Sequence, residues 1–351
     1  MSALTRIQDQ VRDAASKSEA LRIVGGDSKR GLGREAVGKP VSVSDLAGVV
    51  EYQPTELMIT VQAGTTISHL REVLAENRQA LASETPDYGG KATIGGALAC
   101  NQSGPSRPWY GSIRDHVLGV RLINGKAEHL RFGGQVMKNV AGYDVSRLQA
   151  GAMGTFGILT EVSIKVLPEP EASLTVRQEM DADQAIRTMN TIGMKPRPLT
   201  GACWHEGAMF LRLSGPISVI EASAATIGGE QVDNDAEFWS GLREQTLPFF
   251  EGKPDLWRLS LRPTSPHFLS QGDWLIDWGG AQRWLAGRHD HDALEAIAAK
   301  SGGEVGRIRG GDRKSEVLPS LVGIKCELLI RMKQAFDPAG VFNPGRLYSW
   351  L

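Results

Sequence analysis

Hydrophobic and polar positions in the first part of the chain follow helical and strand periods in turn. Apolar side chains recur at helical spacing over residues 4–18, which predicts an amphipathic helix. Short apolar runs predict strands at 21–26 and 56–64. A second helix is expected to follow, because Thr65 or Thr66 can cap the first turn with its side-chain oxygen. The pattern therefore predicts a mixture of helix and sheet from the start of the chain.

A hairpin and a half-buried strand come next. The pair Asn124-Gly125 lies between two apolar runs, and this dipeptide is a strong short-range signal for a hairpin. Residues 158–168 alternate between apolar and polar side chains, as expected of a strand with one covered face. Pro168 and Pro170 then interrupt the pattern, and we take them as the boundary of a first domain.

Beyond this boundary, strand and helix patterns alternate more regularly. The strand-like segments are 173–178, 208–215, 256–262 and 273–278, and the helical segments are 182–192, 216–226 and 291–300. This order predicts two β-α-β-type units, an α+β layer of antiparallel sheet with helices on one face. A last helix is expected at 316–336, followed by a tail that returns to the body. The predicted domains are 1–170, 171–310 and 311–351.

Composition and charge narrow the class of protein. The chain has 351 residues, of which 41% are hydrophobic and 23% charged, as in a globular protein. Its formal net charge of -1 excludes a field that would draw it to nucleic acid or to an anionic membrane. The polar start lacks the apolar core of a secretory signal, and no apolar run has the length of a membrane helix. We expect a cytoplasmic location, peripheral at the inner membrane only through a complex.

The cysteines predict neither a cluster nor a metal site. Cys100, Cys203 and Cys326 are about a hundred residues apart, so the chain has no CxxC pair for iron–sulfur or zinc. We expect three buried, reduced thiols and no metal.

Glycine is concentrated in three separate clusters of the first domain. They are Gly25-Gly26, then Gly89-Gly90 with Gly95-Gly96, then Gly151, Gly154 and Gly157. None has the GxGxxG spacing of a Rossmann domain or the GxxxxGK[ST] spacing of a P-loop. Each cluster alone is typical of tight turns. Interleaved with strands, the three together favour a large anionic cofactor, because glycine lets backbone N–H groups approach an anion closely.

The order of these segments resembles a known flavoprotein family, the vanillyl-alcohol-oxidase-type or PCMH-type FAD domains. The resemblance covers roughly residues 1–170 and the last fifteen, and is carried by "VGGDSKRGLG", "TIGGALACNQSGPSRPWYGSIRDHVLGVRLINGK", "VMKNVAGYDVSRLQAGAMGTFGILTEVSIKVLP" and "DPAGVFNPGRL". Within the family, the chain is similar to the FAD-binding subunits of bacterial glycolate oxidases. The resemblance implies a PCMH-type FAD domain of two α+β subdomains and a ferredoxin-like α+β cap.

The resemblance also implies a set of FAD-binding residues. The diphosphate loop would be Gly25, Gly26, Asp27, Ser28 and Lys29. The ribityl chain and isoalloxazine would lie along Pro86, Thr93, Gly95, Gly96, Asn101, Gly104, Tyr110 and Gly111. The adenosine side would be held by Gly151, Gly154, Thr155, Gly157 and Ile158, and Asn343 of the terminal "NPG" turn would approach the flavin ring. Members with covalent flavin often carry histidine after the glycine pair, where this chain has Asp27-Ser28, so we expect non-covalent FAD.

Catalytic residues are harder to assign. Catalytic 2-hydroxy-acid members of the family carry a metal signature resembling "GHxGDGNxH", which is missing here. The histidine-containing segments nearest to this signature are more typical of a turn or a helix start than of a metal site. His205-Glu206 is typical of a turn between strands, and His289 and His291 are typical of a helix start.

A substrate arginine has only weak candidates. The family pattern L-W-x-x-R corresponds to "LWRLS", with Ser260 in place of arginine. Arg258, Arg262 or Arg212 could hold a carboxylate instead, although a strand arginine is usually a surface charge. The sequence therefore leaves open whether the chain has a catalytic site of its own and whether it is itself an enzyme.

Three hypotheses follow for the function. The first is an FAD-binding subunit that works with a homologous catalytic flavin subunit and an iron–sulfur subunit, the complex converting glycolate to glyoxylate. The second is a self-sufficient 2-hydroxy-acid dehydrogenase, and the third is a structural assembly subunit with little flavin. Six of the eight tryptophans lie in the predicted domain 171–310, where core packing and a docking surface are the alternatives.

Overall fold

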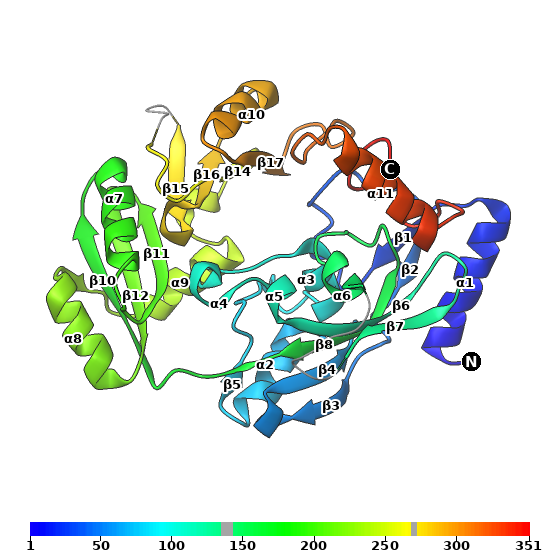
Figure 1. The fold of residues 1–351 in the computed structure, drawn as a ribbon, viewed down its shortest axis with the longest axis horizontal. Coiled ribbons are helices and arrows are strands. Elements are labelled where there is room, and N and C mark those ends of the chain that lie inside the picture. The colour runs from blue at the N-terminus through cyan, green and yellow to red at the C-terminus, as the bar shows by residue number, and fades with distance from the viewer. Residues whose placement is uncertain (135–142, 268–271) are drawn as a thin grey trace. The chain divides into compact units, whose positions relative to one another are not determined.

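The chain forms two compact units, which we describe separately. The structure is a computed structural model that describes residues 1–134, 143–267 and 272–351 (Figure 1). The first unit comprises Met1–Gln102, Ser112–Pro168 and Asp312–Leu351, and the second comprises Ser103–Gly111 and Glu169–Gly311. The segment Ser103–Gly111 thus belongs to the second unit, whereas the sequence prediction included it in domain 1–170. Residues 136–142 of the third family segment lie outside the described residues.

A five-stranded antiparallel sheet is the centre of the first unit. Its strand order is β3-β4-β8-β6-β7. The strands are β3 (Val49–Gln53), β4 (Met58–Gln62), β6 (Val117–Ile123), β7 (His129–Gly133) and β8 (Ile158–Lys165). The predicted hairpin at Asn124 is confirmed by the pairing of β6 with β7. Its loop is longer than two residues, because the Asn124 side-chain oxygen accepts hydrogen bonds from the N–H groups of Lys126 and Glu128.

Two capped helices cover this sheet. The helix α2 (Ile67–Ala75) is capped by Thr66, whose side chain accepts from the His69 N–H. The helix α3 (Ile94–Cys100) is capped in the same way by Thr93. Both bury their apolar side chains in the core that also contains Ile59 and Val162. The glycine-rich stretch after Thr93 is therefore the start of a helix and not a surface loop.

A second layer of the first unit joins the two chain ends. The strands β1 (Leu21–Val24) and β2 (Lys39–Ser42) pair in parallel, and Leu21 also bridges to Phe342 of the tail. The helices α1 (Ala3–Lys17) and α11 (Ile324–Phe336) belong to this part of the chain. The predicted start of the last helix at residue 316 is wrong. Pro319 lacks a backbone donor and Gly323 has a φ of +61°, so the helix begins only after them.

Short elements complete the first unit. They are η1 (Pro54–Glu56), β5 (Gln79–Ala80), α5 (Ile113–His116), α6 (Val145–Leu148) and β9 (Leu167–Pro168). No helix among the described residues has the length and hydropathy to cross a membrane.

The second unit contains two ferredoxin-like motifs in one antiparallel sheet. Its strand order is β13-β10-β12-β11-β15-β16-β14-β17. The first motif is β10 (Ala172–Glu179), α7 (Ala182–Gly193), β11 (Leu199–His205), β12 (Ala208–Gly215), α8 (Ile217–Ile227) and β13 (Glu230–Gln231). The second is β14 (Leu256–Ser260), β15 (Asp273–Asp277), β16 (Gln282–Ala286), α10 (His291–Lys300) and β17 (Glu304–Arg309). The strand order of each motif confirms the ferredoxin-like prediction, although the described part of the second motif has no helix between β14 and β15. The motifs join where β11 pairs with β15.

Helices cover both faces of this sheet, whereas one face was predicted. Met209 and Leu211 of β12 pack in one core with α7 and α8. Phe210, on the opposite face of the same strand, packs in another core with α9 (Asp235–Glu244). The reason is that both faces of β12 carry large apolar side chains. The remaining short elements are α4 (Arg107–Tyr110), η2 (Pro248–Phe250) and η3 (Trp278–Gly280).

Most tryptophans between residues 171 and 310 are core residues. Five are buried: Trp239, Trp257, Trp274, Trp278 and Trp284. Trp204 is half-buried and donates a hydrogen bond from Nε1 to the Met180 carbonyl. Core packing is thus confirmed, and the docking-surface alternative is wrong for the five buried rings.

Candidate cofactor-binding cavity

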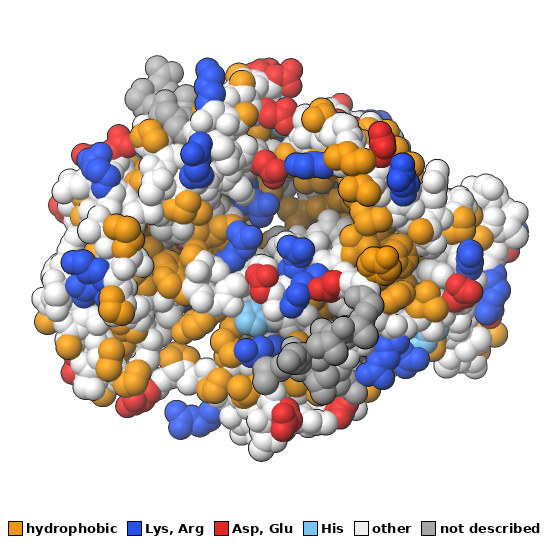
Figure 2. Space-filling view, viewed as in Figure 1, with side chains coloured by type: hydrophobic (Ala, Val, Ile, Leu, Met, Phe, Trp, Pro, Cys, Tyr) orange, Lys and Arg blue, Asp and Glu red, His pale blue; other side chains and the backbone are white. Residues whose placement is uncertain are grey.

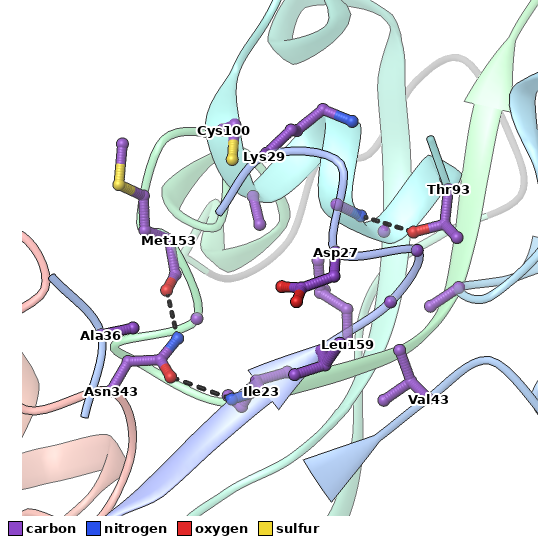
Figure 3. Close-up of a pocket in the computed structure, with 18 of the residues that line it drawn as sticks. Ile23, Asp27, Lys29, Ala36, Val43, Thr93, Cys100, Met153, Leu159 and Asn343 are labelled. Carbon is purple, nitrogen blue, oxygen red and sulfur yellow. Dashed lines mark hydrogen bonds between the residues drawn. The ribbon is translucent and has the colours of Figure 1, made fainter. Parts of the chain in front are cut away.

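Segments far apart in sequence surround one cavity of the first unit. The space inside it that water can reach is about 110 Å³. The lining comes from the end of β1 and the following loop, from α3, from residues 149–159 and from the C-terminal tail (Figure 3). Asp27 and Leu159 lie at its centre in this view, with Cys100 and Lys29 on one side and Asn343 on another. The cavity therefore depends on the returning tail as well as on the glycine clusters.

The loop after β1 is held against the segment that leads into α3. A Cβ on Gly25 would lie 2.5 Å from Thr93 Oγ1, and a Cβ on Gly26 would lie 1.6 Å from the Lys91 carbonyl oxygen. Only glycine fits at this close approach. Asp27 follows with a φ of +52°, so the loop turns sharply toward the cavity.

This loop presents unpaired backbone donors. Among the described residues, no group accepts a hydrogen bond from the N–H of Gly26, Asp27 or Ser28, and all three residues line the cavity. Successive N–H groups in a turn form an anion-binding concavity. The predicted diphosphate loop therefore has the donors that such a group needs.

The charges around the cavity favour an anion as well. Its lining carries four cations and one carboxylate, a net charge of +3. The cations are Arg22, Lys29, Arg30 and Arg346, and the carboxylate is Asp27. Asp27 lies 3.1 Å from the Arg22 guanidinium. Burial lowers the pKa of the Arg346 guanidinium, which donates to backbone carbonyls such as that of Arg34 at 2.7 Å. The excess of positive charge fits the two negative charges of a diphosphate.

Asn343 ties three segments together at the cavity wall. Its Oδ1 accepts from the Ile23 N–H at 2.9 Å, and its Nδ2 donates to the Met153 carbonyl at 2.6 Å (Figure 3). A Cβ on Gly154 would lie 2.7 Å from the same Nδ2, so glycine is required beside it. Both ends of the Asn343 amide are engaged by backbone, and the side chain shapes the wall rather than offering a free polar group.

The cavity brings together most of the residues predicted for FAD. Those in its lining are Gly25, Gly26, Asp27, Ser28, Lys29, Thr93, Gly95, Gly96, Gly154, Gly157 and Asn343. Those outside it are Pro86, Asn101, Gly151, Thr155 and Ile158 of the first unit, and Gly104, Tyr110 and Gly111 of the second. FAD contacts for all of these residues stay a prediction.

Sequence reasoning missed several lining residues. The polar ones are Arg22, Cys100, Gln149 and Arg346. Arg346 follows the "NPG" turn directly, so its place in the terminal motif could have indicated it. Arg22 and Gln149 carry no such signal, because a strand arginine and a lone glutamine are usually surface residues.

The histidine features are confirmed as local structure. Glu206 and Gly207, both with positive φ, form the two-residue turn between β11 and β12. Burial lowers the pKa of His205, which precedes this turn. Asp290 caps α10 by accepting from the Ala293 N–H, as expected of a helix start. The described residues contain no group of three His, Cys, Asp or Glu that could hold a metal ion.

The three arginine candidates lie in the second unit, and none is in the cavity lining. Arg212 donates to the Thr200 carbonyl at 2.8 Å and stacks on Trp239. Arg262 donates to the Ser301 carbonyl at 3.1 Å. Arg258 lies half-buried in β14. A role of these residues in holding substrate stays a prediction.

Comparisons with known proteins agree with this geometry. Residues 4–133 match the family described as FAD binding domain. The chain is 44% identical to glycolate oxidase subunit GlcE of Escherichia coli (strain K12), over 98% of this chain and 97% of that protein. It is 34% identical to glycolate oxidase subunit GlcD of Bacillus subtilis (strain 168), over 41% of this chain and 31% of that protein.

A solved structure of alkyldihydroxyacetonephosphate synthase has the same fold. It aligns with a TM-score of 0.67 over 97% of this chain and 75% of that chain, at 16% identity. The predicted fold class, a PCMH-type FAD domain with an α+β cap, is thus confirmed, and the first unit carries an FAD-binding domain.

Proposed function

Because the chain belongs to the family of glycolate oxidase GlcE subunits, we propose that it is the FAD-carrying subunit of a multi-subunit glycolate oxidase. The complex would convert glycolate to glyoxylate. The observation that carries the proposal is the lining of the cavity, which combines unpaired N–H groups of the loop after β1 with a net charge of +3. Bound FAD would supply an acceptor for the two electrons released when the hydroxyl carbon of glycolate is oxidised.

The chain's own residues would bind and orient this cofactor. The N–H groups of Gly26, Asp27 and Ser28 would donate to the diphosphate, and Lys29 and Arg346 would balance its charge. Asn343 would keep the wall in place through Ile23 and Met153.

Non-covalent attachment is part of the proposal. Among the described lining residues, Cys100 is the side chain with a nucleophilic sulfur. Burial raises the pKa of its thiol, although Lys29 and Arg346 oppose the shift, so the sulfur is protonated near neutral pH and a poor nucleophile.

We further propose that the substrate is oxidised on a homologous GlcD-type flavin subunit, and that an iron–sulfur subunit takes the electrons onward. The contacts of Arg212 and Arg262 support oxidation on the partner subunit. Both guanidiniums donate to backbone carbonyls of their own unit, so they are already engaged and do not serve a substrate carboxylate. The flavin of this chain would support or relay the transfer. Attachment to the membrane would occur through the complex.

Exposed apolar side chains at α11 support assembly with another chain. Ile324, Leu328 and Ile330 of the helix are exposed, as is Val322 just before it, and hydrophobic side chains gather over α11 in Figure 2. Exposed apolar patches of this kind often mark protein–protein contacts.

The proposed function is tested by adding glycolate without oxygen to this chain alone, to its GlcD-type partner alone and to the two together, while recording the visible spectrum. We expect a yellow protein whose absorbance glycolate does not bleach when the chain is alone, and bleaching with the partner present. Acid precipitation of the same yellow preparation should leave all flavin in the supernatant. Bleaching of the isolated chain would instead support a self-sufficient dehydrogenase, and a colourless chain that binds its partner would support an assembly subunit.

A further inference from the structure

A buried side chain of the cavity wall has no partner in the protein. Gln149 is 2% exposed, and its Nε2 has no hydrogen-bond partner among the described residues. The side chain lines the cavity beside Ala99 and Met153. Burying an amide without a partner costs free energy, whereas an apolar side chain in its place would not. A glutamine at this position is therefore explained best by a partner that the protein does not itself provide.

The backbone holds Gln149 in place for such a partner. Gln149 follows directly on α6, and its carbonyl accepts from the Ala152 N–H at 3.2 Å. The next residues are fixed to α3, because the Gly151 N–H donates to the Leu98 carbonyl and the Met153 N–H donates to the Ala99 carbonyl. The amide is thus presented by a rigid segment, which lowers the entropy lost when it binds a ligand.

A side-chain amide carries donors and an acceptor side by side, and this restricts its partner. The diphosphate has acceptors alone, and in the proposed function it would be bound by the loop amides and the cations of the lining. The edge of a nitrogen heterocycle offers a donor next to an acceptor, as in the pairing of glutamine with adenine. Both ring systems of FAD have such an edge, the adenine at its amino group and ring nitrogen, and the isoalloxazine at N3–H and a carbonyl.

We propose that Gln149 is an FAD ligand whose amide hydrogen-bonds to a heterocyclic edge of the bound cofactor. This inference rests on the proposed function, since it requires FAD in the cavity. It assigns to Gln149 a role in recognising the cofactor, separate from the diphosphate loop.

The test compares Gln149→Met with Gln79→Met in the full-length chain. Methionine keeps the length of glutamine and removes its polar end. Gln149→Met is expected to weaken FAD about ten-fold in a fluorescence titration, the size of one buried hydrogen bond. The melting temperature of the flavin-free protein should not fall, because an unpaired amide is replaced by an apolar group.

Gln79→Met should behave in the opposite way. Gln79 is also buried, but its Nε2 donates to the Pro54 carbonyl and its Oε1 accepts from the Tyr52 hydroxyl. Its replacement should lower the melting temperature and leave FAD affinity unchanged. A second variant, Gln149→Glu, keeps the size and removes the N–H donors, and should also weaken FAD.

Titrations with ADP and with riboflavin separate the two rings. If Gln149→Met also weakens the binding of ADP, the partner of Gln149 is the adenine. If it also weakens the binding of riboflavin, the partner is the isoalloxazine. Unchanged FAD affinity in Gln149→Met, or a lower melting temperature of its flavin-free form, would overturn the inference. If the unmodified chain binds no FAD, the proposed function itself fails, so the two failures are distinguishable.

Discussion

Replacing Gly26 with alanine is expected to destabilise the first unit by about 3 kcal/mol, the upper end of the cost of overpacking. The new Cβ would lie 1.6 Å from the Lys91 carbonyl oxygen, which is backbone and cannot rotate away. The loop that carries Asp27 and Ser28 would have to move, and its N–H groups would lose their place at the cavity. We expect FAD affinity to fall by about a hundred-fold, the equivalent of a similar free energy. Urea unfolding and an FAD titration of the purified variant measure the two effects.

Gly31→Ala is the matched control for this change. Gly31 lies in the same loop, and a Cβ there would have no atom within 4 Å. This substitution should change the free energy of unfolding by less than about 0.5 kcal/mol, as is usual for open surface positions. Equal effects of the two alanines would mean that the close contact at Gly26 does not hold the loop.

Removing the Asp337 carboxylate is expected to cost about 3–5 kcal/mol of unfolding free energy, because it leaves the buried Lys333 ammonium without a counter-charge. The two groups lie 2.7 Å apart, with side-chain exposures of 10% for Lys333 and 0% for Asp337. Asp337 also accepts from the Val341 and Phe342 N–H groups. Burial lowers the pKa of Lys333, and Asp337 opposes this shift. Asp337→Ala should therefore loosen the tail that carries Asn343 and weaken FAD as well, as measured by urea unfolding and titration.

The helix α11 offers a control, an ion pair with the same i,i+4 spacing as Lys333 and Asp337. Glu327 and Arg331 form an i,i+4 pair at 3.7 Å on its exposed face. Glu327→Ala should cost less than about 0.5 kcal/mol, because exposed helix pairs contribute little. A cost for Asp337→Ala no larger than that of Glu327→Ala would show that the buried pair does not stabilise the tail.

The second unit follows the hydrophobic pattern closely. Strands such as 208–215 and helices such as 182–192 were predicted within a residue or two, because each has one clear period and one apolar face. The two faces of β12 were the exception. Helices were predicted on one face of the sheet only, but α9 packs on the other face against Phe210 of β12.

The first unit was predicted less well where tertiary contacts decide the structure. The sequence of α3 contains adjacent glycines and has the composition of a loop, yet it forms a helix. Thr93 caps its first turn, and Gly95 lies so close to Ala63 that a Cβ would come within 2.8 Å. Such contacts between distant segments leave no local pattern.

The residues of the cavity lining also differ in whether a local sequence motif predicts them. The glycine loop and Asn343 were predicted through a family resemblance that preserves motifs. Arg22 and Gln149 were missed, because their place in the lining depends on β1 and α6 meeting other segments.

If backbone loops from distant parts of the first unit converge on FAD, their amides should exchange more slowly when FAD is bound, and amide hydrogen exchange with and without FAD measures this. We expect slower exchange in peptides that cover 25–30, 93–100 and 149–157, with no change over β10 of the second unit. Unchanged exchange in all three segments on saturation with FAD, or protection confined to other parts of the chain, would contradict it.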